Sequence, residues 1–277
     1  MNVLVAVNEV YLEPLSVMLY SLCTHNQEKI KVYILHFAIP LEEQKKFICK
    51  VKKWGKRIDI FFLQSDENKF NGVVWSERYQ NETNLRLLML ELLPTGLDKV
   101  LWLDADIIIK GSVKKLYNYP DKGQYAIACY DMFSSSEKQE ILSQLDLKYA
   151  GKYFNAGVIV FYLTNMRKEL PRNVFLQWMY DHPDKLKYPD QNTLNVCLSK
   201  KIVWAKPEIY NLQLLRVCDQ KLLKQAKIVH YNTKEKPWKE SYSGYGELLY
   251  WKYAVKVLGI KRMILHYFLK LAENLRI

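Results

Sequence analysis

The feature that most restricts the fold of this chain is the regular alternation of apolar runs and amphipathic segments in its first 62 residues. Short runs typical of buried strands occupy residues 1–7, 30–37 and 58–62. Between them, apolar residues recur at helical spacing from Leu15 to about His25, and a second helix is predicted over 41–54. Strands and helices that alternate in this way predict an α/β fold, a Rossmann-like, mostly parallel sheet flanked by helices.

The pattern continues along the chain. It predicts helices over 81–93 and 188–198, further strands that begin at Val100, Tyr125 and Ile228, and a strand within residues 153–163. Ligands of such sheets bind beyond the carboxyl ends of the strands, which places residues 8–11 and the motif D-A-D at 104–106 on one rim. The glycine fingerprint G-x-G-x-x-G is absent, so we expect no dinucleotide site.

Asp104 and Asp106 follow a buried apolar strand directly. Two carboxylates so close together repel each other unless a positive group shares their site. Carboxylate oxygens are the ligands that Mg²⁺ and Mn²⁺ prefer, so the pair is a candidate metal site. The alternative is a turn with two solvated acids, and this motif alone does not decide between them.

The net charge of +12 favours an anionic partner such as a nucleotide, a nucleic acid or a membrane surface. Lys and Arg are spread along the chain without a dense patch, so we expect no nucleic-acid partner. The five cysteines are odd in number and form no C-x-x-C pair, which favours a reducing cytoplasm over a disulfide framework or a zinc site. We expect neither a signal peptide nor a transmembrane helix.

Several polar residues allow two interpretations. Arg86 is either a surface residue with a buried stem or a partner of phosphate or carboxylate. Residues 155–157 (N-A-G) are either a turn before a strand or a place where the backbone approaches a ligand. Residues 190–192 (D-Q-N) are either helix caps or partners of sugar hydroxyls. His230 is either structural or, with Lys236, part of a metal and diphosphate site.

Four motifs, L-W-L-D-A-D at 101–106, Y-F-N-A-G-V at 153–158, P-D-Q-N-T-L-N at 189–195 and H-Y-N-T-K-E-K-P-W at 230–238, occur together. In this order and spacing they resemble glycosyltransferase family 8, nearer to its bacterial lipooligosaccharide galactosyltransferases than to glycogenin. The resemblance covers residues 1 to about 240. It implies a GT-A fold and a retaining, metal-dependent transfer of galactose or glucose from a UDP-sugar to a glycan or glycoconjugate acceptor.

The resemblance also implies roles for individual residues. The metal, Mn²⁺ or Mg²⁺, would be held by Asp104, Asp106 and His230. The UDP-sugar would contact Ala6, Asn8, Tyr11, Arg86, Asp104, Ala105, Thr233, Lys236 and Trp238. The catalytic pocket around the transferred sugar would contain Arg86, Asn155, Asp190 and Gln191.

This chain departs from the family pattern at three positions. Asn8 stands where the bacterial relatives usually carry Asp, but its carbonyl still accepts a hydrogen bond from uracil N3–H. Thr233 replaces a glycine, and a β-branched residue resists positive φ. The loop around Thr233 therefore need not follow the family's path over the diphosphate. Asn192 replaces an Asp that would be a candidate nucleophile. The amide of Gln191 is a poor nucleophile, so we expect front-side attack with Asp190 stabilising the developing charge.

Two other functions fit the same residues. One is self-glucosylation on one of the 20 tyrosines, as in glycogenin. The other is a catalytically silent protein that binds sugar nucleotides, although such a protein need not keep Asp104, Asp106 and His230 together.

We divide the chain into a GT-A catalytic domain, 1–245, and a helical tail, 246–277. From Ile260 an apolar stripe recurs at helical spacing and comprises Met263, Ile264, Tyr267, Phe268, Leu271 and Leu275. Six Lys or Arg against two Glu give the tail a net charge of +4. A basic amphipathic helix suits an anionic bilayer, so we expect peripheral attachment to the inner face of the plasma membrane. The alternative is packing on the catalytic core or on another subunit.

Overall fold

The computed structural model describes residues 1–55, 57–71, 73, 81–147 and 151–274. The strands in this part of the chain are β1 Asn2–Ala6, β2 Ile30–His36, β3 Ile58–Gln64, β4 Lys99–Leu103, β5 Ile107–Ile109, β6 Ala126–Tyr130, β7 Phe154–Tyr162, β8 Ile202–Ala205, β9 Leu212–Gln213 and β10 Ile228–His230. Its α-helices are α1 Leu12–His25, α2 Leu41–Lys52, α3 Met89–Leu92, α4 Lys114–Tyr117, α5 Ser135–Gln144, α6 Leu163–Glu169, α7 Val174–Asp181, α8 Pro189–Leu198, α9 Pro207–Tyr210, α10 Gln220–Gln225, α11 Glu247–Leu258 and α12 Ile260–Asn274. Short 3₁₀ helices are η1 Glu9–Tyr11, η2 Glu67–Phe70, η3 Asn81–Leu88, η4 Pro183–Lys185 and η5 Ser199–Lys201.

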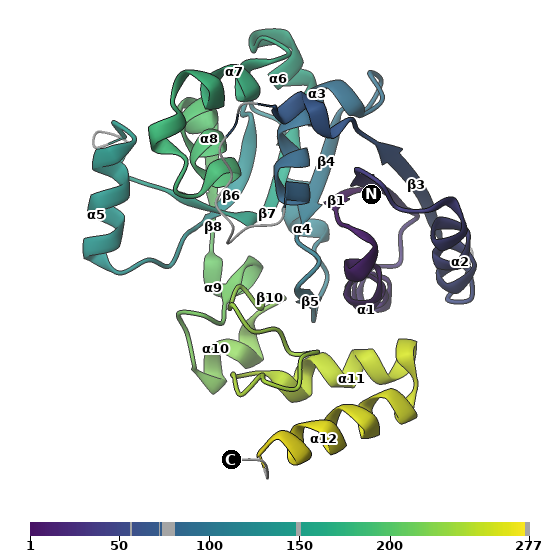
Figure 1. Cartoon of the computed structure of the whole chain (residues 1–277). Helices are drawn as coiled ribbons and strands as arrows, with labels where there is room; N and C mark the ends of the chain where they lie inside the picture. Colours follow the sequence, from purple (N-terminus) through teal and green to yellow (C-terminus); the bar gives the residue numbers. More distant parts are fainter. Residues whose placement is uncertain (56, 72, 74–80, 148–150, 275–277) are drawn as a thin grey trace.

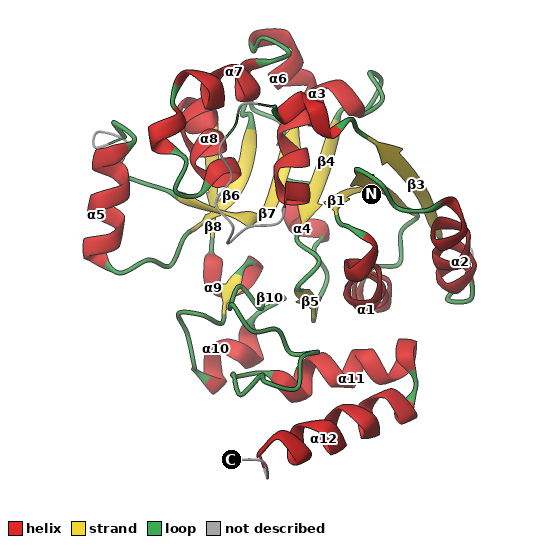
Figure 2. Ribbon diagram, in the orientation of Figure 1, coloured by secondary structure: helices red, strands yellow, loops and turns green. Residues whose placement is uncertain are grey.

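The described strands form one larger and one smaller sheet. The larger has the order β3-β2-β1-β4-β7-β6-β8 and the smaller the order β5-β10-β9. Helices flank the larger sheet, and the smaller sheet lies at one end of it, next to the C-terminal helices (Figure 1 and Figure 2). The predicted α/β architecture, a mostly parallel sheet between helices, is confirmed.

The first half of the larger sheet follows the predicted alternation closely. β1 pairs in parallel with both β2 and β4, and β2 pairs in parallel with β3. Both faces of β1 are covered: Val3 and Val5 belong to the core under α1 and α2, and Leu4 to the core on the opposite face. Burial on both faces explains why these strands read as continuous apolar runs.

β7 runs antiparallel to both of its neighbours, β4 and β6. Its first residues therefore lie at the same rim where β1, β4 and β6 end. Asn155, Ala156 and Gly157 lie inside this strand, so the interpretation as a turn before it is wrong. The reversal brings these three residues next to the end of β4, where Asp104 N donates a hydrogen bond of 3.0 Å to Gly157 O.

Two predicted helices differ in detail. Residues 81–93 form the 3₁₀ helix η3 followed by one turn of α-helix, α3. α8 begins at Pro189 as predicted. Gln191 and Asn192 do not cap it, because their amides bond to Ala156 N, Asp131, Tyr153 and Lys185 O, whereas the Asp190 carboxylate does accept backbone hydrogen bonds in the first turn.

The C-terminal residues form a helical hairpin, α11 and α12, that turns at Gly259 with φ +86°. α11 buries Tyr250, Trp251 and Tyr253 in a cluster that also contains residues of β5, β9 and β10. The helix predicted from Ile260 is therefore present, whereas Leu275 lies outside the described residues. None of the described helices combines the length and the apolar character needed to cross a membrane.

Candidate active site

The two sheets together bring Asp104, Asp106 and His230 to one place. Asp104 follows the end of β4, and the chain passes Asp106 directly into β5 of the smaller sheet. β5 pairs antiparallel with β10, whose last residue is His230. His230 Nε2 consequently lies 3.2 Å from Asp106 Oδ1 and 3.6 Å from Asp104 Oδ2. One potential ligand atom from each residue lies within 4.8 Å of the other two.

The donor set of this cluster fits a divalent cation. Asp106 Oδ1 is buried and accepts no hydrogen bond of acceptable geometry in the described part of the chain. Asp104 Oδ1 accepts from Arg86 and from the Trp102 indole, at 3.0 and 2.8 Å, which leaves Oδ2 facing His230. Two carboxylates and one imidazole form a mixed oxygen and nitrogen ligand set of the kind that first-row divalent metals accept.

Lys236 lies on the loop after β10 and reaches the same cluster. Its Nζ lies 2.7 Å from Asp106 Oδ2 and 2.8 Å from Tyr231 O. Burial alone would raise the pKa of Asp106, but the nearby charges of Lys236 and His230 outweigh it and hold this pKa well below its usual range. Asp106 is therefore an anion at neutral pH.

Arg86 is 2% exposed, so the interpretation as a surface residue is wrong. Its guanidinium lies 3.0 Å from both Asp104 Oδ1 and Asp190 Oδ2. It also donates to Ala156 O at 2.6 Å and stacks over the Trp102 ring, with Cζ 4.0 Å from the ring centroid. Burial raises the pKa of Asp190, and the charge of Arg86 opposes that rise. Arg86 thus links a carboxylate of the D-A-D motif to one at the start of α8.

Gln191 and Asn155 both point to a carboxylate that sequence reasoning left out of the site, Asp131. Gln191 Nε2 and Asn155 Nδ2 donate to Asp131 Oδ2 at 3.0 and 3.1 Å. Gln191 Oε1 accepts from Ala156 N at 2.8 Å, so both ends of this amide are occupied. Burial raises the pKa of Asp131. The available sequence signal was that Asp131, like Asp104, directly follows a predicted strand.

Asn211 is a second residue that the sequence did not single out. Its Oδ1 lies 3.0 Å from His230 Nδ1, and its Nδ2 donates to Asn155 Oδ1 at 2.9 Å. It follows the short helix α9 in an irregular stretch, where no motif marks it.

Gly157 explains how His230 comes so close to β7. A Cβ atom at this position would lie 2.3 Å from His230 Cε1 and 3.0 Å from Asp104 Oδ2. The imidazole of His230 thus makes the close approach at Gly157, and an approach of this backbone to a ligand stays a prediction.

The residues assigned to the nucleotide lie along the adjoining part of the rim. Asn8 Oδ1 accepts a hydrogen bond of 3.2 Å from Tyr11 N and caps η1. Tyr11 meets Trp238 edge to face, with ring centroids 5.8 Å apart. Burial, with the negative charges of Asp106 and Asp104, raises the pKa of Tyr11 to about 12.

Three further residues were assigned to the UDP-sugar, Ala6, Ala105 and Thr233. Ala6 ends β1, Ala105 separates the two carboxylates, and Thr233 Oγ1 donates to Glu235 O at 2.5 Å. In the described chain Asp146 alone of the non-glycine residues has positive φ. Thr233 is therefore accommodated without the strain that its β-branch would cause at positive φ.

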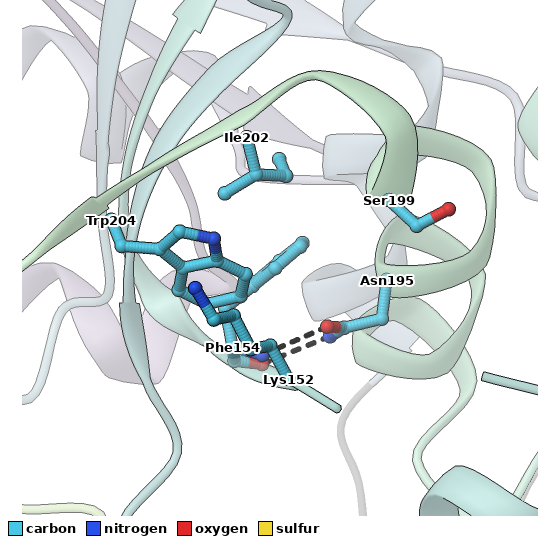
Figure 3. A pocket seen from close by; sticks show the side chains of 6 residues that line it. All are labelled: Lys152, Phe154, Asn195, Ser199, Ile202 and Trp204. Atoms are coloured by element: carbon cyan, nitrogen blue, oxygen red, sulfur yellow. Dashed lines mark hydrogen bonds between the residues drawn. The ribbon is translucent and has the colours of Figure 1, made fainter. Parts of the chain in front are cut away.

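A separate cavity of about 240 Å³ lies at the outer edge of the sheet and is lined by Lys152, Phe154, Asn195, Ser199, Ile202 and Trp204 (Figure 3). Asn195 exchanges two hydrogen bonds with the backbone of Phe154, which closes one side of the cavity. None of the candidate residues lines it. Successive residues of a strand point to opposite faces, so Phe154 turns toward this cavity and Asn155 toward the cluster.

Comparison with known proteins now identifies the family. The model described as "Glycosyl transferase family 8" matches residues 2–241. The chain belongs to glycosyltransferase family 8. Among the relatives of this glycosyltransferase, a "Putative glycosyltransferase" of Haemophilus influenzae is 26% identical over 72% of this chain and 60% of its own length. The "Lipopolysaccharide 1,2-glucosyltransferase" of Escherichia coli K12 is 25% identical over 92% of this chain and 78% of its own length.

Solved structures show the same fold. The galactosyltransferase LgtC, in complex with donor and acceptor sugar analogues, superposes with a TM-score of 0.79 at 22% identity. The match covers 92% of this chain and 96% of LgtC. The predicted GT-A fold and the resemblance to family 8 are both confirmed.

Proposed function

We propose that this family 8 glycosyltransferase moves galactose or glucose from a UDP-sugar to a glycan or glycoconjugate acceptor, with retention of configuration and with Mn²⁺ or Mg²⁺. The observation that carries the proposal is the buried Asp106 Oδ1, which accepts no hydrogen bond from the described residues and faces His230 Nε2. Lys236 pairs with the other oxygen, Oδ2, so Oδ1 itself stays unpaired, and burying it is costly unless a positive charge binds it. A divalent cation bound by Asp104, Asp106 and His230 would supply that charge.

The residues nearest the metal site would bind the UDP part of the donor. A divalent cation held by Asp104, Asp106 and His230 would stabilise the negative charge that develops on the departing UDP diphosphate. Lys236, 2.7 Å from Asp106, lies beside the cluster and donates charge-assisted hydrogen bonds to the same diphosphate. Asn8 and Tyr11 hold the uracil, with Trp238 packed behind Tyr11. Ala6, Ala105 and Thr233 complete the nucleotide contacts.

The sugar half is built from Arg86, Asn155, Asp190 and Gln191. Gln191 is held at both ends of its amide and is a poor nucleophile, which supports front-side attack by the acceptor over a covalent intermediate. Asp190, ion-paired with Arg86, stabilises the positive charge that develops on the sugar ring and accepts from its hydroxyls.

Incubation with labelled UDP-galactose or UDP-glucose and Mn²⁺, without acceptor, tests this function. Slow, metal-dependent release of UDP is the expected result, and the faster donor names the sugar. Label on the protein would indicate self-glycosylation, and neither product would indicate a silent binder. Asp106→Asn serves as the control, because it removes a proposed metal ligand and should abolish the release.

We further propose that residues 246–277 form a tail that attaches the catalytic domain, 1–245, to the anionic inner face of the plasma membrane. α12 carries large apolar side chains that are 39–66% exposed, namely Ile260, Ile264, Leu265, Phe268, Leu269 and Leu271. Met263 and Tyr267 of the predicted stripe instead pack against the core cluster with α11. The apolar surface of α12 is thus split between the protein and the solvent, and Lys261 lies beside the exposed part.

Vesicle sedimentation tests the attachment. Replacing Ile264, Phe268 and Leu271 together by Ser keeps Met263 and Tyr267, so the hairpin should remain folded. We expect this variant to lose sedimentation with phosphatidylserine vesicles at low salt while UDP release is unchanged. Leu41→Ser, at a 62% exposed leucine of α2, is the matched control. If the wild type ignores the vesicles and sediments as a dimer, α12 is a subunit interface.

A further inference from the structure

A chain of buried hydrogen bonds leads from His230 away from the two carboxylates. His230 Nδ1 lies 3.0 Å from Asn211 Oδ1, and Asn211 Nδ2 donates to Asn155 Oδ1 at 2.9 Å. Asn155 Nδ2 in turn donates to Asp131 Oδ2 at 3.1 Å. His230, Asn211 and Asn155 are all buried. We call this chain the His230 relay, and it joins the ends of β10, α9, β7 and β6.

The backbone N–H of Gly157 determines the direction of every hydrogen bond in the relay. Gly157 N donates to Asn155 Oδ1 at 3.0 Å, and a backbone N–H cannot act as an acceptor. Asn155 Oδ1 is therefore the accepting end of this amide, and its nitrogen donates to Asp131. Asn211 must then turn its nitrogen toward Asn155 and its oxygen toward His230. A neutral His230 consequently carries its hydrogen on Nδ1 and a lone pair on Nε2.

We propose that Asn211 is a positioning residue that holds the proton of His230 on Nδ1 and so keeps Nε2 free for the divalent cation. The inference rests on the proposed function, in which His230 is a metal ligand. The competing tautomer carries the proton on Nε2. It is favoured because Nε2 lies 3.2 Å from Asp106 and 3.6 Å from Asp104, and both carboxylates attract a proton. Without the Asn211 carbonyl, the proton moves to Nε2 and occupies the ligand position.

Metal affinity measured by calorimetry in saturating UDP tests the inference without relying on turnover. Asn211→Leu keeps the size of the side chain and removes its oxygen, and we expect Mn²⁺ to bind about 10–100-fold more weakly. Asn195→Leu is the matched control, because Asn195 is also buried and bonds to the Phe154 backbone but does not touch His230. We expect the control to lower the melting temperature and leave the Mn²⁺ affinity unchanged.

The ¹⁵N spectrum of the metal-free protein, labelled at its five histidines, reports the proton position directly. The His230 signals are assigned with His230→Gln and read at a pH above which they no longer move. We expect the Nδ1–H form in the wild type and the Nε2–H form in Asn211→Leu. A wild-type Nε2–H form would overturn the inference even if Asn211→Leu fails to fold.

The same experiments separate this inference from the proposed function. If His230→Gln does not weaken Mn²⁺ binding, the metal site itself is wrong. If His230→Gln weakens binding and Asn211→Leu does not, the metal site stands and the role of Asn211 is refuted.

Discussion

Gly157→Ala is the smallest change that tests the geometry of the active site, because it adds one methyl group between β7 and His230. The new Cβ would lie 2.3 Å from His230 Cε1 and 2.7 Å from Nδ1. Ordinary contact begins at 3.4 Å, so the imidazole would have to move by about 1 Å. The backbone of Gly157 is outside the positive-φ region, so alanine adds no backbone strain there.

The displacement has two expected costs. Overpacking a well-filled site costs about 1–3 kcal/mol of unfolding free energy. Moving a metal ligand by about 1 Å also disturbs the reacting geometry, for which a loss of about 100-fold in rate is typical. The imidazole of His230 cannot move away easily, because it is buried and its Nδ1 is hydrogen-bonded to Asn211. We therefore expect a loss of metal affinity and UDP release well beyond the loss of stability.

Gly96→Ala is the matched control, because a Cβ at Gly96 would meet no atom within 4 Å and its φ is not positive. Urea unfolding, Mn²⁺ calorimetry and UDP release are measured for both variants. Wild-type Mn²⁺ affinity in Gly157→Ala would refute the placement of His230 against β7.

Three further predictions follow from the same site. Asp104→Asn should abolish Mn²⁺-dependent UDP release without changing the circular dichroism spectrum, and full activity would refute the metal assignment. Lys236→Ala should cost about 2–4 kcal/mol of transition-state stabilisation, measured as kcat for UDP release, and an effect confined to the acceptor KM would place Lys236 elsewhere. Arg86→Leu should cost about 3–5 kcal/mol in urea unfolding, because it leaves Asp190 buried without its partner. Arg86 opposes the rise in the pKa of Asp190, so this pKa is higher still in the variant. The cost should shrink as the pH falls through that higher pKa, since the neutral acid needs no partner; a cost independent of pH would contradict it.

The elements that sequence analysis placed best are those with a strong local period. β1, α1, β2, α2 and β3 lie within a few residues of their predicted bounds, because burial on one or both faces imposes a spacing that the sequence displays. The rim position of Asp104 followed from its place at the end of a strand, and that too is local information.

The polar residues were harder to interpret because their chemistry is the same in either setting. Arg86 fits a surface position as well as a buried ion pair, and only the fold shows that Asp104 and Asp190 surround its guanidinium. Asn211 and Asp131 lie in segments without a motif, and their partners come from other strands.

The sequence by itself determined the alternation of strands and helices, the rim position of Asp104 and Asp106, and, through its four motifs, the resemblance to family 8. The tertiary structure decided the reversed direction of β7 and the contact of Asp106 with His230. It also decided which apolar residues of α12 pack against the protein and which stay exposed. Hydrophobic periodicity is a property of neighbouring residues, so a sequence displays it. Strand direction and the pairing of distant polar groups depend on which surfaces pack together, and that is settled only when the whole core forms.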